Sequence, residues 1–394
     1  MSFINGLYNE FYEKYENRDN IHMFFSPGRV NLIGEHLDYN GGYVFPCALN
    51  FGTNMLISLR KDKKARFYST NYSSKGIIEF DITNIKYNKS HGWVNYLKGV
   101  ILEIIYKGKK IDRGFDVLVS GNIPNGSGLS SSASLEVVMG IAINNCFNLN
   151  MSMVSIVKLS QKAENKFIGV NCGIMDQFAV GMGKKDRAIL LNCNTLKYEY
   201  TKLKLKNIDL IILNTNKKRG LVDSKYNDRR SECELALETI RKIKNIKNLT
   251  DMDEREFEKI KYIIKDETIR KRAKHVVYEN SRVLKAVNEL NDNNIAEFGQ
   301  LMNYSHLSLK NDYEVTGLEL DTLVELAWKH NGVLGARMTG GGFGGCTVNL
   351  VKSKDVDSFI EFVSSRYEKI IGYEPSVYKC KIGDGAKEIK QRMN

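Results

Sequence analysis

The chain has 394 residues, a length that predicts two or three domains, and its 42% hydrophobic residues suffice for ordinary cores. Its net charge of +12 comes from short, scattered basic groups without interleaved aromatic residues, which favours a lysine-rich solvated surface over nucleic-acid binding. No apolar run approaches the roughly 18 residues of a membrane helix, and the N-terminus has no signal-peptide pattern, so we expect a cytoplasmic protein without a membrane partner.

Cysteine and proline usage adds two constraints. The seven cysteines are widely scattered and include no CxxC pair, which fits reduced thiols better than disulfides or a zinc site. With only four prolines, no low-complexity linker and no fixed repeat, any domain boundary must be compact. We place it within residues 193–205, where helix-rich segments give way to a new strand, and predict domains at 1–195 and 196–394.

The predicted elements mix strands and helices irregularly along the chain. Runs of β-favouring or alternating residues predict strands at 43–49, 53–60, 115–120, 208–214 and 347–351. Apolar or amphipathic patterns predict helices directly after Ser130 and at 152–167, 226–246 and 321–330. The helix after Ser130 is apolar almost all round, so we expect it to be buried.

A glycine-serine segment at residues 124–134, PNGSGLSSSAS, stands between a predicted strand and a predicted helix. Glycines let backbone N–H groups approach a polyanion, and a helix N-terminus adds free donors and a favourable dipole. Serines there can cap the helix or offer a hydroxyl to Mg²⁺ or phosphate. The segment is therefore a candidate phosphate loop, with a flexible turn and helix cap as the alternative. A Walker A motif is absent from the chain.

A literal GxGxxG occurs at Gly340, Gly342 and Gly345. A dinucleotide site would need a helix after this motif, whereas the residues that follow alternate like a strand. We therefore reject a dinucleotide site here. The pattern predicts a glycine hairpin, or a close backbone approach to another element, at residues 339–345.

Four polar side chains, Arg29, Glu35, His36 and Asp38, lie between glycines in one short, turn-rich segment. Sugar hydroxyls require carboxylate acceptors and groups that both donate and accept, placed at several angles. Apolar residues within the segment anchor it to a core, which argues against an ordinary solvated loop. A metal site is a further alternative, although the spacing matches no established ligand pattern.

Two more carboxylates are candidates for function. Asp176 stands between apolar residues, and a partly buried carboxylate is costly unless its charge is paired. A helix N-cap explains an aspartate at this position equally well. Glu164 lies within a predicted helix, where a glutamate is ordinarily exposed.

Taken together, these segments resemble the galactokinase family, a branch of the superfamily of galactokinase, homoserine kinase, mevalonate kinase and phosphomevalonate kinase (the GHMP kinases). Residues 28–39 are similar to the galactokinase signature, 126–133 to the superfamily's ATP loop and 336–346 to its third motif. The resemblance follows the family's order over nearly the whole chain. Its one departure is Leu37, where many members carry Thr.

The resemblance implies a two-domain α+β fold of the GHMP-kinase type. Its N-terminal domain would be ribosomal protein S5 domain 2-like and its C-terminal domain ferredoxin-like, with the active site in the cleft between them. It also implies a cytoplasmic, monomeric enzyme that uses Mg²⁺ and transfers the γ-phosphoryl of ATP to the anomeric hydroxyl of α-D-galactose. Galactose and ATP are then the partners, without nucleic acid or membrane.

The resemblance further implies residue roles. The catalytic base would be Asp176, and the stabiliser of the transition state would be Arg29. Galactose would be bound by Glu35, His36, Leu37, Asp38, Gly173 and Tyr226. ATP would be bound by Ser69, Gly126, Ser127, Gly128, Leu129, Ser130, Ser131 and Ser132. Mg²⁺ would be held by Ser132 and Glu164.

Two alternatives to this activity stay open. A sensor that binds galactose and ATP without catalysis would lack part of the serine-rich loop, whereas residues 130–134 and Asp176 are intact here. An N-acetylgalactosamine kinase would need a larger sugar pocket, and pocket size is not encoded in these motifs.

Overall fold

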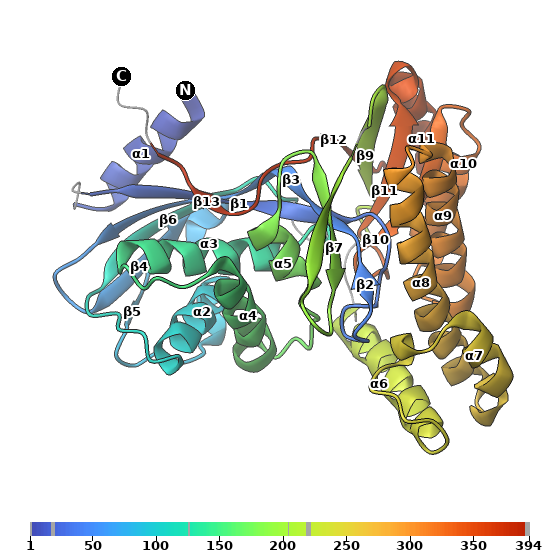
Figure 1. Cartoon of the computed structure of the whole chain (residues 1–394). Coiled ribbons are helices and arrows are strands. Elements are labelled where there is room, and N and C mark those ends of the chain that lie inside the picture. Colours follow the sequence, from blue (N-terminus) through green and yellow to red (C-terminus); the bar gives the residue numbers. More distant parts are fainter. Residues whose placement is uncertain (1, 17–19, 125–126, 204, 218–221, 391–394) are drawn as a thin grey trace.

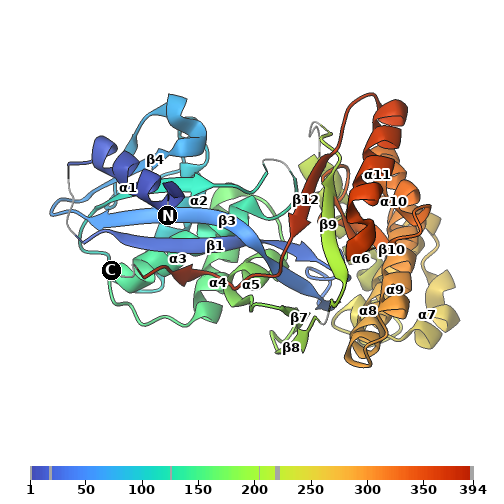
Figure 2. The same cartoon turned by 90° about the horizontal axis from the view of Figure 1, so that it is seen from above.

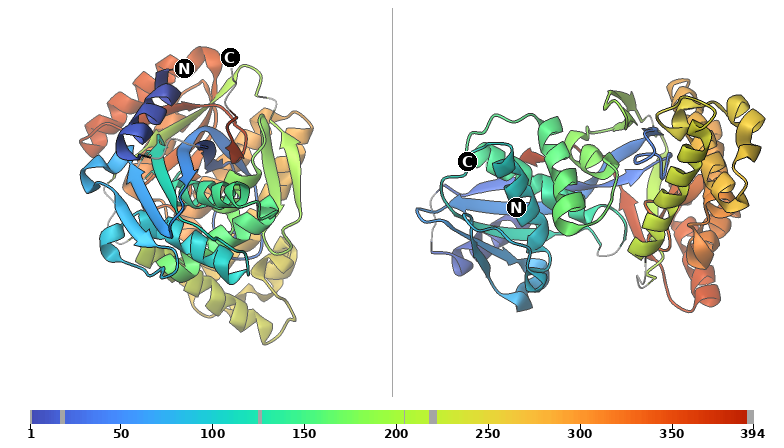
Figure 3. Two further views of the ribbon diagram at one scale, coloured as in Figure 1. Left: turned by 90° about the vertical axis from the view of Figure 1, so that its left-hand side faces the viewer. Right: turned by 90° about the horizontal axis from the view of Figure 1, so that it is seen from below.

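The computed structural model describes residues 2–16, 20–124, 127–203, 205–217 and 222–390. Within these residues the strands form three sheets, on which the helices pack (Figure 1). The elements gather into two groups that lie side by side, as the view from below in Figure 3 shows. None of the described helices is both long and apolar enough to span a membrane, and no disulfide joins the described cysteines.

The first group is built on a six-stranded sheet with the order β13-β1-β3-β6-β4-β5. Its strands are β1 (His22–Asn31), β3 (Pro46–Leu59), β4 (Lys64–Ser69), β5 (Ile78–Asp81), β6 (Phe115–Gly121) and β13 (Lys387–Glu388). Helices that cover one face are α2 (Val94–Tyr106), α3 (Ser131–Cys146), α4 (Met153–Ala163) and α5 (Met175–Met182). Helix α1 (Ser2–Lys14) packs on the other face (Figure 1).

Strand β6 has two buried faces, whereas its alternating sequence pattern predicts one buried face. Val117 packs against the four-helix side, whereas Leu118 packs against Phe11 and its neighbours on α1. Helix α1 covers the second face and excludes water from it. The sequence of β6 alone gives no information about a helix that is so far away in the chain. The glycine-serine segment, a candidate phosphate loop, therefore follows a strand that is buried in a core.

The second group is built on a four-stranded antiparallel sheet with the order β10-β11-β9-β12. Its strands are β9 (Ile208–Asn214), β10 (Val333–Thr339), β11 (Cys346–Lys352) and β12 (Ser376–Cys380). Its helices are α6 (Val222–Arg241), α7 (Glu254–Ile260), α8 (Glu267–Asn291), α9 (Ile295–Ser308), α10 (Gly317–Trp328) and α11 (Val356–Ile371). Ile211 packs with α10 and α11, and Ile212 with α8 and α9, because neighbouring side chains of a strand face opposite sides.

The α+β class and the expected elements are confirmed, with differences at their ends. The two strands predicted at 43–49 and 53–60 are largely one strand, β3, preceded by the short β2 (Tyr43–Val44). The helix predicted at 152–167 is α4 followed by a π-helical turn, Glu164–Ile168. The last helical residues predicted for 226–246 are wrong, since α6 ends at Arg241.

A small sheet and the C-terminal strand connect the two groups. The sheet contains β2, β7 (Arg187–Asn192) and β8 (Tyr198–Lys202), and the β7–β8 hairpin spans residue 195. The chain passes from β12 back to the first group, where β13 pairs with β1 (Figure 2). Pairing thus crosses the proposed division into 1–195 and 196–394, which stays a prediction.

We expect the buried carboxylate of Asp116 to stabilise the fold. Asp116 on β6 is fully buried and accepts hydrogen bonds from Arg60 Nη1 at 3.2 Å and Arg66 Nε at 2.6 Å. Asp116→Ala removes the acceptor that both guanidinium groups share, so we expect it to lower the free energy of unfolding by about 2–4 kcal/mol. Urea unfolding followed by circular dichroism measures the change.

Asp62→Ala is the matched control, because the exposed Asp62 is the second partner of the same Arg60. We expect that substitution to cost no more than about 1 kcal/mol. Equal losses for the two variants would contradict the role given to the buried pair.

Candidate active site

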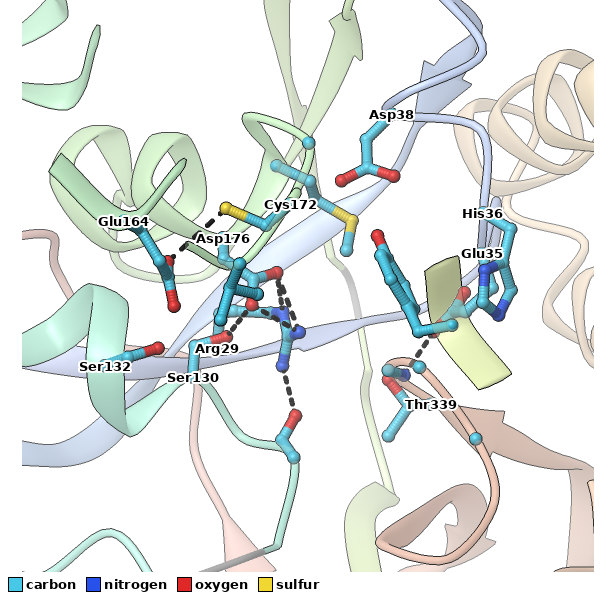
Figure 4. Close-up of a pocket in the computed structure, with 18 of the residues that line it drawn as sticks. Arg29, Glu35, His36, Asp38, Ser130, Ser132, Glu164, Cys172, Asp176 and Thr339 are labelled. Carbon is cyan, nitrogen blue, oxygen red and sulfur yellow. Dashed lines mark hydrogen bonds and ion pairs between the residues drawn. The ribbon is translucent and has the colours of Figure 1, made fainter. Parts of the chain in front are cut away.

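One cavity of about 410 Å³ lies between the two groups of elements (Figure 4). It is reached by the end of β1, the glycine-serine loop, the α4–α5 region, α6 and the β10–β11 turn. The predicted site residues that line it are Arg29, Glu35, His36, Asp38, Gly128, Ser130, Ser131, Ser132, Glu164, Gly173, Asp176 and Tyr226. Residues far apart in the sequence therefore meet in one place, as the sequence motifs together predict.

Arg29 and Asp176 form an ion pair in the middle of this cavity (Figure 4). Arg29 Nε donates to Asp176 Oδ1 and Nη2 donates to Oδ2, both at 2.8 Å. Arg29 is almost fully buried beside a β-bulge of β1, whereas the Asp176 side chain is 29% exposed toward the cavity. Asp176 lies in the first turn of α5 and is not the N-cap, which is Ile174. A two-point guanidinium contact fixes the plane of the carboxylate.

The glycine-serine loop contacts both members of this pair. Arg29 Nη1 donates to Gly128 O at 2.6 Å, and Ser130 Oγ donates to Asp176 Oδ2 at 2.7 Å. Ser130 stands at the N-cap of α3, but its side chain makes no capping hydrogen bond. Among the serines of this segment, Ser130 therefore does not supply the side-chain cap that serines there can provide, because its hydroxyl is directed at Asp176. The first N–H groups of α3 remain uncapped by Ser130, as anion binding at a helix N-terminus requires.

The glycine turn between β10 and β11 packs directly on the same loop. A Cβ on Gly340 would lie 3.2 Å from Gly128 O, and one on Gly345 would lie 3.0 Å from Ser127 O. Both glycines also have a left-handed φ of +88°. The predicted hairpin and close backbone approach are confirmed, and they bring the second sheet against the candidate phosphate loop.

Glu35 joins the two halves of the cavity through a buried ion pair. Its carboxylate accepts hydrogen bonds from Arg337 Nη1 at 2.6 Å, Asn31 Nδ2 at 2.6 Å and Gly340 N at 2.9 Å. Burial raises the pKa of the Glu35 carboxyl group, and Arg337 opposes this shift. The side chain is thus held by protein groups from both sheets.

His36 has a left-handed backbone, with φ at 64°, and its ring is buried among tyrosines. Its Nδ1 lies 2.8 Å from Tyr39 Oη, and Tyr39 Oη lies 2.8 Å from Tyr313 Oη. Its Nε2 is buried without a hydrogen-bond partner among the described residues. Burial lowers the pKa of His36 well below its usual value, so the ring is neutral. The Tyr226 ring lies 5.7 Å from the His36 ring.

Asp38 faces the cavity from the same segment and is half-buried. Burial raises its pKa to about 7, and the charge of Asp176 adds to the shift. A Cβ on Gly173 would meet Asp38 Oδ2 at 2.0 Å, so this contact requires glycine at position 173. Leu37 points the other way, into the hydrophobic core, and does not line the cavity.

Glu164 and Ser132 lie together at the opposite side of the cavity (Figure 4). Glu164 is buried, contrary to the expectation for a helical glutamate, because it starts the π-helical turn that faces the cavity. Burial raises the pKa of its carboxyl group, and a hydrogen bond with Ser132 opposes the shift. Its Oε2 also accepts from Gln177 Nε2 at 2.6 Å.

These two oxygen donors fit a magnesium ion that takes its other ligands from phosphate and water. Among the described residues, no group of three or more His, Cys, Asp or Glu side chains could hold a metal. The alternative of a metal at Glu35, His36 and Asp38 therefore finds no support.

A second cavity, of about 190 Å³, opens on the other side of the glycine-serine loop. Ser69 lines it, as do Asn71, Trp93 and Tyr96, together with the loop serines Ser131 and Ser132. Ser69 stays a predicted ATP-binding residue, and the sequence analysis did not include Trp93 and Tyr96. No sequence motif includes Trp93 or Tyr96. The available signal is that one aromatic residue stands just before a helix and the other within it.

The remaining loop residues are placed as follows. Ser127 and Leu129 are buried beneath the loop, with 1% exposure each, and do not line the main cavity. Gly126 lies outside the described residues.

Comparison with known proteins agrees with this geometry. Residues 95–184 match the model of the GHMP kinases N terminal domain, and residues 283–369 match that of the GHMP kinases C terminal domain. Residues 9–59 match the galactokinase galactose-binding signature.

Relatives cover the whole chain. A galactokinase of Clostridium beijerinckii is 59% identical over 99% of this chain and 100% of its own length. A galactokinase of Bacillus subtilis is 53% identical over 95% of this chain and 96% of its own. A crystal structure of Lactococcus lactis galactokinase complexed with galactose has a TM-score of 0.97 at 48% identity, covering 98% of this chain and 100% of that one.

More distant structures share the fold alone. A mevalonate kinase of Methanococcus jannaschii has a TM-score of 0.66 at 19% identity, over 93% of this chain and 100% of that one. The expected GHMP-kinase-type fold is thereby confirmed. With full-length relatives above 50% identity and a matching galactose-binding signature, the chain belongs to the galactokinase family.

Proposed function

We propose that the protein transfers the γ-phosphoryl of ATP to the anomeric hydroxyl of α-D-galactose, giving α-D-galactose 1-phosphate and ADP. One observation carries the proposal: the Arg29–Asp176 pair lies in a single cavity between the glycine-serine loop and the segment of Glu35, His36 and Asp38. The pair thus stands between a candidate phosphate site and a candidate sugar site. The galactokinases among its relatives and the galactose complex of the Lactococcus lactis enzyme support the choice of sugar.

In this mechanism the anomeric oxygen attacks the γ-phosphorus, and the bond to the bridging oxygen of ADP breaks. The proton of the sugar hydroxyl passes to Asp176, the carboxylate that is partly open to the cavity. Arg29 stabilises negative charge on the transferred phosphoryl group, and its pairing with Asp176 keeps both groups oriented. Most of the catalytic effect then comes from positioning and charge stabilisation.

Galactose is held on the side of the cavity formed by β1 and α6. Asp38 accepts from sugar hydroxyls, the unpartnered His36 Nε2 makes a further hydrogen bond, and Tyr226 closes the pocket. Gly173 lets the backbone approach the sugar beside Asp38. Glu35 acts at the edge of this pocket while its carboxylate is held by Arg337.

ATP is held on the other side, with its phosphates on the loop N–H groups and the start of α3. The second cavity suits the nucleotide base, since Trp93 and Tyr96 offer flat faces beside the polar Ser69 and Asn71. Ser132 and Glu164 would hold Mg²⁺, which would supply positive charge to neutralise the phosphates there.

The enzyme works as a cytoplasmic monomer. Cysteines without disulfides suit a reducing compartment.

A coupled assay of ADP release tests the activity directly. We expect turnover with galactose and ATP, and little with glucose, arabinose, mevalonate or homoserine, because the polar groups around Asp38 and His36 would be left unpaired by the wrong hydroxyl pattern. Reactions without sugar give the background. Equal turnover with N-acetylgalactosamine would favour the rival kinase activity, and galactose binding without ADP release would favour a sensor.

Asp176→Asn tests the base. The amide keeps the shape of the carboxylate but cannot accept the proton, so we expect kcat to fall by roughly 10²–10⁴-fold while galactose still binds. Steady-state kinetics and calorimetric titration with galactose measure the two effects. Asp186→Asn, an exposed aspartate remote from the cavity, should behave as wild type. Turnover near the wild-type rate in Asp176→Asn would rule out the base role.

Glu164→Gln tests the metal-binding role. The neutral amide is a poorer magnesium ligand, so we expect the Mg²⁺ concentration for half-maximal turnover to rise roughly tenfold or more. Mg²⁺ titrations at fixed ATP and galactose measure it, with the exposed Glu199→Gln as control. Identical titration curves for Glu164→Gln and wild type would refute the assignment.

A further inference from the structure

We propose that Ser130 is a positioning residue for the base Asp176, a role distinct from the ATP binding that the family resemblance implies for it. Its hydroxyl orients the carboxylate for proton transfer from the sugar. This inference rests on the proposed function, because it presupposes that Asp176 accepts that proton.

Three donor atoms from two segments of the chain surround the Asp176 carboxylate. Oδ1 lies 2.8 Å from Arg29 Nε and 2.7 Å from Arg29 Nη2. Oδ2 accepts from Arg29 Nη2 at 2.8 Å and from Ser130 Oγ at 2.7 Å. The Ser130 hydroxyl thus adds a donor from the glycine-serine loop to the two donors of one guanidinium group. Ser130 thereby helps to hold the carboxylate in the orientation in which it meets the sugar hydroxyl.

The backbone of Ser130 indicates that the hydroxyl has a use that a plain turn would not need. Its φ of 62° and ψ of 47° lie in the left-handed region, where any residue with a Cβ is strained and glycine is the easy choice. The side chain is buried and makes no helix cap. Figure 4 shows it directed at Asp176, so the strained geometry aims the hydroxyl at the base instead of at the helix N–H groups.

The same three-residue stretch also contacts Arg29. Gly128 O accepts from Arg29 Nη1 at 2.6 Å, and Arg29 N donates to Leu129 O at 3.3 Å. Residues 128–130 therefore contact Arg29 through their backbone and Asp176 through the Ser130 hydroxyl. One segment of the candidate phosphate loop therefore contacts both members of the Arg29–Asp176 pair.

Ser130→Ala and Ser130→Gly test the role together. Both remove the hydroxyl, so we expect kcat to fall roughly 10- to 100-fold in each, with KM for galactose and ATP within about threefold of wild type. Glycine also relieves the left-handed strain, so Ser130→Gly should melt about 1–3 °C above Ser130→Ala. Equal loss of turnover despite unequal stability separates positioning from a purely structural role.

Ser130→Thr is the conservative variant for rescue. It keeps the hydroxyl but places a β-branched side chain on a left-handed backbone, so we expect a lower Tm than wild type with kcat within about threefold of it. Asp186→Gly relieves a left-handed φ of 57° at an exposed position away from the cavity and should leave kcat unchanged. In an Asp176→Asn background, Ser130→Ala should cause no further loss of turnover.

Three results would overturn the proposal. The first is a Ser130→Gly enzyme with a kcat near wild type. The second is a raised KM for ATP at unchanged kcat, which would make the hydroxyl a phosphate ligand. The third is a wild-type chain that folds but phosphorylates no galactose; that result defeats the proposed function and this inference with it, whereas the first two leave the proposed function standing.

Discussion

A buried ion pair between Glu35 and Arg337 is the contact on which the geometry of the cavity depends. Both side chains are almost wholly excluded from water, so the attraction between them is weakly screened. Asn31 Nδ2 and the Gly340 N–H add two further hydrogen bonds to Glu35, and one acceptor position on its Oε1 stays open. Because Glu35 follows β1 and Arg337 lies on β10, the pair locks the two sheets in one relative position. The glycine turn thereby packs closely against the candidate phosphate loop.

Burial of the cavity walls shifts the pKa values of several of their side chains. Burial lowers the pKa of His36 and raises the pKa values of Asp38 and Glu164. The Arg29 guanidinium lies in the same cavity and is paired with Asp176. Positive charge and polar groups of both kinds are therefore gathered within one enclosed space.

Much of this arrangement could be predicted from local pattern. The glycine-serine loop, the hairpin at residues 339–345 and the polar segment around Glu35 each have a composition that restricts what the backbone can do there. The failures share one cause, which is contact between distant residues. The pattern of β6 could not reveal that α1 covers its second face, and serine composition could not reveal that Ser130 turns away from its helix toward Asp176.

The sequence established the family, the α+β class and most of the predicted residues that line the cavity, because motifs of fixed spacing encode local backbone geometry and chemistry. Only the tertiary structure decided how those motifs face one another. It placed Arg29 against Asp176, gave Glu35 its partner on β10 and set Trp93 beside the loop. These relations depend on packing between segments far apart in the chain, where burial and the need to satisfy each buried charge determine the outcome.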